Sequence, residues 1–121
     1  MYNMNPVLLH NGELVKCKGF STEVIMGQTL SWIKSAKEKK KPFFIYLPTP
    51  APHGPYKENI PAEWKTKWLD QGYNHNVAGR YALVEDLDAQ LGRFMKQLDE
   101  WKLMENTLVI FITDNGPNMG G

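Results

Sequence analysis

Two continuous apolar runs, each followed by a polar loop, dominate the pattern of hydrophobic and polar positions along this chain. Residues 42–47 read PFFIYL, and residues 107–113 read TLVIFIT. Runs of this length, rich in β-branched and aromatic side chains and closed by turn residues, predict strands that are buried on both faces of a sheet. We therefore expect one strand over 42–47 and another over 107–113.

Helical and hairpin patterns surround these two runs. Asn11-Gly12 lies between two short apolar stretches and is the strongest short signal for a hairpin turn. Apolar side chains at steps of three and four residues predict amphipathic helices. In the longer helix they form one stripe, which consists of Tyr81, Val84, Leu87, Leu91, Phe94, Leu98 and Trp101. The expected elements are a hairpin over 7–15, helices over about 22–39 and about 77–101, strands over 42–47 and 107–113, a proline-rich loop over 48–57 and a second loop over 114–118.

The order of these elements indicates the fold class. A strand, a helix and a second strand in succession predict a right-handed crossover that leaves the two strands parallel. We therefore predict an α/β fold, with mostly parallel sheet strands and crossover helices.

Side chains suited to chemistry follow both predicted strands. Asp114 and Asn115 come directly after the second strand and offer the hard oxygen ligands that calcium or magnesium prefers. His53 lies in the loop after the first strand, among four prolines, and suits a general acid or base or an anion ligand. Taken singly, Asp114-Asn115 also fits a plain turn and His53 a plain surface histidine. Because ligands bind beyond the carboxyl ends of such strands, the two loops together favour a shared site.

Three stretches of the chain resemble the type I sulfatases of the alkaline-phosphatase-like superfamily. They are LLHNGELVKCKGFSTEVI (8–25), PFFIYLPTPAPHGPY (42–56) and YALVEDLDAQLGRFMKQLDEWKLMENTLVIFITDNGPN (81–118). They occur in the family's order and together cover nearly the whole chain. The resemblance implies a partial alkaline-phosphatase-like fold.

The resemblance also implies a chemistry. Sulfatases of this type hydrolyse sulfate esters with a formylglycine nucleophile and a divalent cation, usually calcium. On that basis Asp114 and Asn115 are expected to ligate the cation. His53 is expected to contact the sulfate and assist the leaving oxygen. The family's usual locations are periplasmic, secreted or lysosomal.

The nucleophile segment of the family is not found in this sequence. Formylglycine forms from cysteine or serine in a Cys/Ser-x-Pro-x-Arg context, and the single cysteine, Cys17, has neither the proline nor the arginine. We therefore expect an internal piece of a sulfatase that is inactive alone. Because buried strands in such a piece would lose some of their neighbours, we expect it to self-associate through open strand edges or to be only marginally stable as a monomer.

Composition and charge restrict the kinds of partner that this chain is expected to bind. The 121 residues carry a net charge of +1, which gives no electrostatic argument for nucleic acid or an anionic membrane. No apolar stretch is long enough to span a bilayer, and one cysteine excludes an internal disulfide. A sulfated small molecule or glycan is the expected partner. The alternatives are a phosphate or phosphonate ester hydrolase of the same superfamily, a binding protein on a sulfatase-like scaffold, and a stand-alone interaction module.

Overall fold

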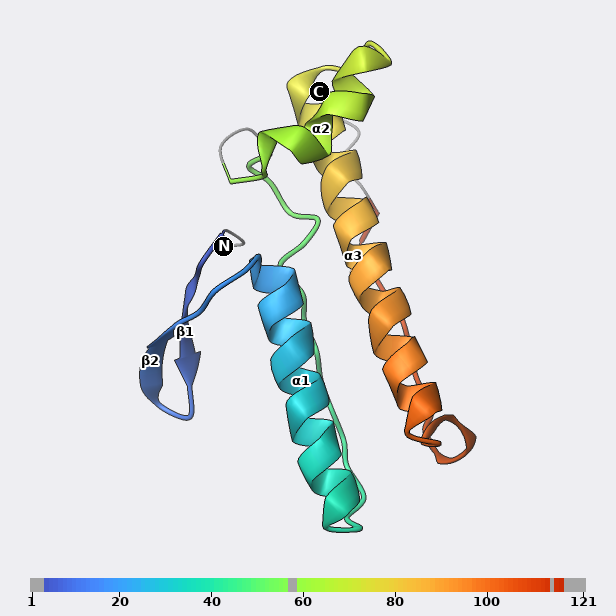
Figure 1. The fold of residues 1–121 in the computed structure, drawn as a ribbon. Helices are drawn as coiled ribbons and strands as arrows, with labels where there is room; N and C mark the ends of the chain where they lie inside the picture. The colour runs from blue at the N-terminus through green and yellow to red at the C-terminus, as the bar shows by residue number, and fades with distance from the viewer. Residues whose placement is uncertain (1–3, 57–58, 114, 117–121) are drawn as a thin grey trace.

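Three α-helices and one hairpin form the regular structure of the described residues, 4–56, 59–113 and 115–116, in this computed structural model (Figure 1). The elements in chain order are β1 (Val7–His10), β2 (Glu13–Lys16), α1 (Ser21–Glu38), α2 (Ala62–Asp70), α3 (His75–Glu100) and the 3-10 turn η1 (Met104–Asn106).

The hairpin forms where Asn11-Gly12 predicts it. Strands β1 and β2 pair antiparallel, with His10 opposite Glu13. Asn11 has φ = 53° and Gly12 has φ = 90°. Positive φ at both central residues is what the tight two-residue turn of a hairpin requires, and asparagine and glycine tolerate it best.

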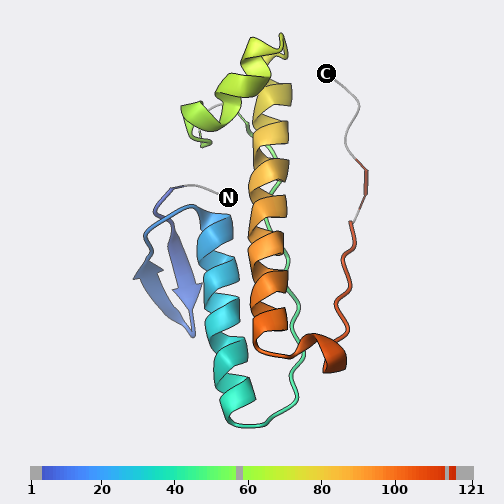
Figure 2. The same ribbon diagram turned by 45° about the vertical axis from the view of Figure 1, so that its right-hand side comes forward.

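Helices α1 and α3 lie side by side and enclose the larger apolar core (Figure 2). Met26 and Ile33 of α1 meet Phe94 and Leu98 of α3, and each of the four side chains is less than a tenth exposed. Such side chains together remove several hundred Å² of apolar surface from water, which makes this contact a main source of stability.

A second core forms where α2 crosses the N-terminal half of α3. Phe20 precedes α1 and packs with Ile60, Ala82 and Leu83, while the Trp64 ring lies 4.8 Å from that of Phe20. Helix α2 begins after Pro61 and is followed by Gly72, which has φ = 87°. Proline at the start and glycine past the end are typical helix boundaries.

The buried face of α3 differs from the predicted stripe in its first half. Tyr81 and Val84 are exposed, whereas Ala78, Ala82 and Leu83 are almost fully buried. At Gly79, on the same part of the helix, Tyr56 lies so close that no larger side chain would fit. The second half follows the prediction at Phe94 and Leu98.

The structure also differs from the prediction at residues 42–47 and 107–113, because neither segment is a strand. Along the first segment, Phe43, Ile45 and Leu47 pack on the α1–α3 core, but Phe44 and Tyr46 are 87% and 78% exposed. The five residues 108–112 are all exposed. A strand needs a hydrogen-bonding neighbour, and a segment buried on both faces needs two covering layers. The described residues give 42–47 one covering layer and no paired neighbour.

Both segments nevertheless run in the same direction. Figures 1 and 2 show the chain over 42–47 rising behind the α1–α3 layer and the chain over 107–113 rising beside α3. Helix α3 lies between the two segments in the sequence and runs in the opposite direction. Both segments therefore run toward the end of the molecule at which α3 begins.

Candidate functional site

His53 lies in a tight turn that its own backbone and side chain hold. The His53 N–H donates to the Pro50 carbonyl at 3.0 Å, and the Thr49 hydroxyl donates to the Ala51 carbonyl at 3.1 Å. The imidazole Nδ1 lies 2.7 Å from the Gly54 carbonyl oxygen. Ala51 is buried, while the His53 ring is exposed. The turn therefore presents an ordered imidazole to solvent.

Tyr56 anchors this loop to α3. Its side chain packs against the core of Phe20, Ile60 and Ala82, and the Arg80 guanidinium lies 5.4 Å from the centre of its ring. Gly79 lies against Tyr56 with no side chain between them. The sequence places Tyr56 three residues after His53 but does not predict its contact with α3. The signal for this contact was the run of small residues Ala78-Gly79 and Ala82 at helical spacing.

The second candidate loop is described only in part. Asn115 is exposed, and its side-chain Nδ2 donates to the Gly116 carbonyl at 3.0 Å. This bond uses the amide nitrogen and leaves the Oδ1 lone pairs available to a cation. Asp114, the other predicted ligand, lies outside the described residues. The donor chemistry of the pair suits calcium, although calcium usually takes six to eight oxygens.

The described structure does not join His53 and Asn115 in one site. Among the described residues, no hydrogen bond or ion pair links His53 with Asn115. The described part of the chain also holds no group of three or more histidine, cysteine, aspartate or glutamate side chains that could bind a metal.

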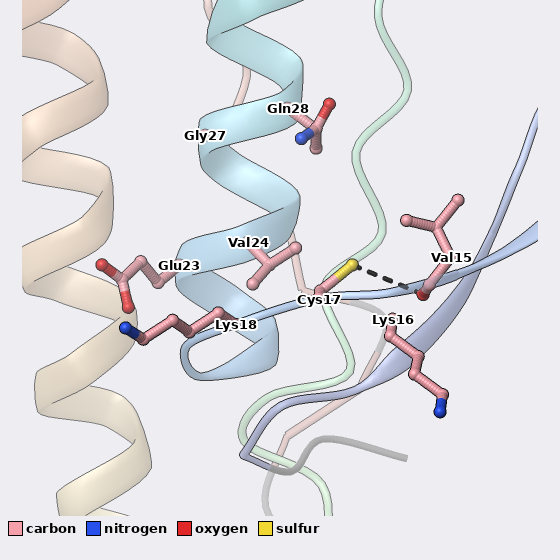
Figure 3. A pocket seen from close by; sticks show the side chains of 8 residues that line it. All are labelled: Val15, Lys16, Cys17, Lys18, Glu23, Val24, Gly27 and Gln28. Carbon is pink, nitrogen blue, oxygen red and sulfur yellow. Dashed lines mark hydrogen bonds between the residues drawn. The ribbon is translucent and has the colours of Figure 1, made fainter.

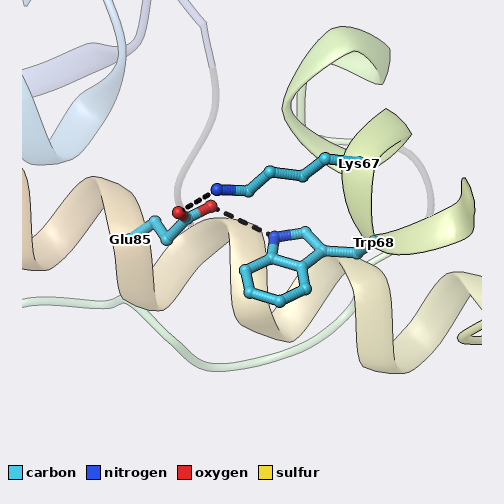
Figure 4. A network of polar contacts seen from close by, with 3 residues as sticks. All are labelled: Lys67, Trp68 and Glu85. Carbon is cyan, nitrogen blue, oxygen red and sulfur yellow. Dashed lines mark hydrogen bonds and ion pairs between the residues drawn. The ribbon is translucent and has the colours of Figure 1, made fainter. Parts of the chain in front are cut away.

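Glu85 and Asp86 are adjacent on α3, so their side chains are expected to point in different directions and not to form a carboxylate pair. The structure agrees with this expectation. Glu85 accepts hydrogen bonds from the Lys67 ammonium and, at 3.1 Å, from the Trp68 indole N–H (Figure 4). Asp86 faces α1 instead and accepts from Gln90 at 3.2 Å. Glu85 thus ties α2 to α3, and Asp86 belongs to the α1–α3 contact.

Burial raises the pKa of the Asp86 carboxyl. Gln90 and Thr22 favour its charged form, although the Thr22 Oγ1 makes no hydrogen bond of normal geometry. The positive charge of Arg93 lowers this pKa in addition, and the negative charge of Glu23 raises it. Asp86 Oδ2 is itself buried and unpaired. This is the chemistry of a partly desolvated structural carboxylate.

A shallow pocket of about 310 Å³ lies between the hairpin and α1 (Figure 3). Cys17 lines it, with the thiol directed to the Val15 carbonyl at 3.6 Å. Neither His53 nor Asn115 lines this pocket. Of the other two histidines, His10 lies in β1 and His75 begins α3, and both are exposed.

The chain is similar in sequence to known sulfatases. The protein-family model named Sulfatase matches residues 2–121. The uncharacterized sulfatase YdeN of Escherichia coli K12 is 29% identical over 99% of this chain and 21% of its own length. The N-acetylgalactosamine-6-sulfatase of Canis lupus familiaris is also 29% identical, over 99% of this chain and 22% of its own. The arylsulfatase of Klebsiella aerogenes is 27% identical over 82% of this chain and 31% of its own.

The match over almost all residues shows the class of protein that the fold and loops only suggested. This chain belongs to the sulfatase family, whose members have an alkaline-phosphatase-like α/β fold. It spans about a fifth to a third of the length of these curated relatives. No solved structure matches it. Within the described residues, no helix is both long enough and apolar enough to cross a bilayer.

Proposed function

We propose that this chain forms part of the active site of a sulfuric ester hydrolase. The observation that carries the proposal is the family match over residues 2–121. The names of the relatives, which include arylsulfatase and N-acetylgalactosamine-6-sulfatase, support the same chemistry. The proposed partner is a sulfated small molecule or glycan, and the proposed setting is a parallel sheet in which 42–47 and 107–113 are neighbouring strands.

His53 is the proposed acid–base residue of this chain. Its exposed imidazole lies in a turn fixed by backbone hydrogen bonds, so little entropy is lost when it meets a substrate. A histidine exchanges protons near neutral pH and can therefore protonate the oxygen that leaves sulfur. Its positive form also favours the anionic sulfate group.

Asp114 and Asn115 are the proposed calcium ligands. A bound calcium ion supplies Lewis-acid stabilisation to the sulfate oxygens. In this chain Asp114 would contribute a carboxylate, and Asn115 its Oδ1, which the bond to Gly116 leaves available. The further oxygens and the formylglycine nucleophile would come from sequence other than these 121 residues.

A phosphate or phosphonate ester hydrolase of the same superfamily is the main alternative. A non-catalytic binding protein on the same scaffold is the other. The sulfatase-named relatives favour the sulfate ester. Sequence upstream of Met1 in the gene would separate these proposals, because a Cys/Ser-x-Pro-x-Arg segment there would supply the nucleophile.

The experiment that tests the proposal places this chain in a complete enzyme. The 121 residues replace the matching segment of the Klebsiella aerogenes arylsulfatase, and turnover of an aryl sulfate and an aryl phosphate is compared. We expect sulfate turnover that falls by roughly 10²–10⁴-fold in His53→Ala, the usual contribution of a general acid or base. His75→Ala, another exposed histidine, serves as the matched control. Preferential phosphate turnover would support the alternative.

The isolated chain is expected to be catalytically inactive. One imidazole and an incomplete set of metal ligands do not replace the attacking group of a covalent mechanism. The measurement is release of the aryl alcohol from an aryl sulfate by the purified chain in excess calcium. Turnover that disappears in His53→Ala would contradict this prediction.

The isolated chain is also expected to bind calcium weakly, because Asp114 and Asn115 supply only a few of the required oxygens. Calorimetric titration with calcium should give no micromolar site. Micromolar binding that is lost in Asp114→Ala would mean that this chain contributes more ligands than these two.

A further inference from the structure

The contact between Tyr56 and α3 is unusually close. A Cβ at Gly79 would lie 2.6 Å from the Tyr56 Cβ and 2.8 Å from the Tyr56 carbonyl oxygen. Both distances are shorter than any normal contact, so glycine alone lets the two backbones meet here. We call this contact, formed by Tyr56 and Gly79 with Arg80 over the tyrosine ring, the Tyr56 seat.

The Tyr56 seat reaches back to the turn that carries His53. A Cβ at Gly54 would lie 3.4 Å from the Tyr56 ring, so the ring packs against the residue next to His53. The same ring contacts the core around Phe20 and Ala82. The position of Gly54 is thus set by a side chain that is itself held by α3.

The Gly54 carbonyl determines which nitrogen of His53 carries the proton. A carbonyl oxygen only accepts hydrogen bonds, and it lies 2.7 Å from the imidazole Nδ1. The neutral ring must then hold its hydrogen on Nδ1 and its lone pair on Nε2. A free histidine favours the opposite tautomer, with the hydrogen on Nε2.

We propose that the Tyr56 seat is a positioning device that fixes His53 in its Nδ1–H tautomer and leaves Nε2 to exchange protons. The residues that act through His53 are Tyr56, Gly79 and Arg80, and none of them is assigned contact with a substrate. The catalytic use of Nε2 rests on the proposed function, whereas the tautomer itself does not.

The proton balance shows why the tautomer matters. In the charged ring both nitrogens carry hydrogen, and Nε2–H is the one not bound to Gly54. When sulfur forms its bond to an attacking oxygen supplied from outside these 121 residues, its bond to the leaving oxygen breaks. The leaving oxygen then takes the Nε2 proton, and the ring returns to the neutral Nδ1–H form. The hydrogen bond to Gly54 persists throughout, so the ring does not turn between steps.

The test is ¹⁵N nuclear magnetic resonance of the 121-residue chain labelled at histidine, at a pH where the rings are neutral. His53→Gln identifies the His53 signals, and exposed His10 and His75 are the internal references. We expect the ratio of Nδ1–H to Nε2–H in His53 to exceed the ratios in His10 and His75 by up to roughly tenfold, the shift that one net hydrogen bond provides. A His53 ring in the Nε2–H form would overturn the proposal.

Gly79→Ala tests the seat, and Gly92→Ala is its matched control. Both glycines lie in α3, but a Cβ at Gly92 meets nothing within 4 Å. Gly79→Ala should shift His53 toward the Nε2–H form, and Gly92→Ala should leave it unchanged. A folded Gly79→Ala chain with an unchanged His53 tautomer would show that the Tyr56 seat does not set this tautomer.

Tyr56→Ala covers the case in which Gly79→Ala does not fold. It removes the ring from Gly54 without adding a clash, and the same loss of the Nδ1–H preference is expected. Retention of that preference would overturn the proposal. Because no substrate is present in these measurements, a failure of the sulfatase assay and a failure of the tautomer prediction are distinguishable.

Discussion

Asp86 is a partly buried carboxylate whose charged form is disfavoured in the folded protein. Its carboxyl lies between α1 and α3, its Oδ2 has no hydrogen-bond partner among the described residues, and burial raises the pKa of the carboxyl. The folded state therefore holds the Asp86 proton more tightly than the unfolded chain does. Stability from this group is present below the ordinary aspartate pKa and is lost as the pH rises through the higher, folded value.

Asp86→Asn is accordingly expected to stabilise the protein at neutral pH. The amide keeps the Oδ1 that accepts from Gln90 and removes the partly desolvated charge. The gain should be about 1 kcal/mol or less, because solvent reaches the carboxyl in part. Urea unfolding at about pH 7 and about pH 3 measures it, with Asp88→Asn on the exposed face as control. An equal gain at both pH values would contradict the burial argument.

Single residues and residue pairs predict much of the local structure. Asn11-Gly12 fixes the hairpin because few other residue pairs tolerate positive φ twice in succession. The chemistry of imidazole and the proline-rich loop single out His53 as a candidate. Its hydrogen bond to Gly54, however, depends on a turn that the pattern of hydrophobic and polar residues does not predict. Tyr56 on Gly79 is a contact between residues 23 positions apart, which sequence spacing does not show.

At the scale of elements, Glu85 joins α2 to α3. Its carboxylate accepts from Lys67 and Trp68 together, whereas Glu100 accepts from Gln97 at 2.9 Å and pairs with Lys96 at 3.9 Å, both within one turn on the same helix. The two glutamates are comparable in exposure, so they make a matched pair. They differ in one respect: the interactions of Glu85 connect two helices, whereas those of Glu100 lie within α3.

Glu85→Ala should loosen α2, and Glu100→Ala should not. Exposed ion pairs contribute little singly, so we expect a loss of roughly 0.5–1 kcal/mol for Glu85→Ala, mostly from the indole hydrogen bond, and less than about 0.5 kcal/mol for Glu100→Ala. Hydrogen exchange of the α2 backbone amides is the measurement. Equal exchange in the two variants would show that aromatic packing of Trp64 and Trp68 alone holds α2.

The helices were predictable to within a few residues, but the face of α3 was not. The predicted stripe placed Tyr81 and Val84 inward on the assumption that large apolar side chains are buried. In its first half, α3 instead buries Ala78, Ala82 and Leu83, and at Gly79 the neighbouring chain lies too close for a larger group. Which face is buried depends on the partner, and the partner is a tertiary property.

At the scale of the whole molecule, the unpaired segments are the main departure from the sequence-based expectation. The apolar runs at 42–47 and 107–113 have the composition of central strands, yet neither has a hydrogen-bonding neighbour in the described structure. Their exposed side chains include Phe44, Tyr46 and Ile110. Composition predicts what kind of environment a segment requires, but it does not supply the neighbouring strands that create that environment.

The isolated chain is therefore expected to self-associate. Unpaired backbone groups beside exposed apolar side chains form a ready template for a strand from a second copy. The exposed fractions of Phe44, Leu108 and Ile112 are 87%, 84% and 78%, and pairing of two copies would cover part of this surface. Sedimentation velocity and thermal melts over a range of concentrations measure the effect, and the melting temperature should rise with concentration.

Ile110→Lys tests whether residues 107–113 make that contact. A charge at the centre of an edge strand opposes pairing with another copy, so this variant should sediment as a smaller species than the parent chain at equal concentration. Leu14→Lys places the same charge on the hairpin at a side chain of similar exposure, 75% against 71%, and should leave association unchanged. A parent chain that sediments as a monomer and melts at one temperature at every concentration would contradict the open-edge argument. It would mean that the α1–α3 core is sufficient for an autonomous domain.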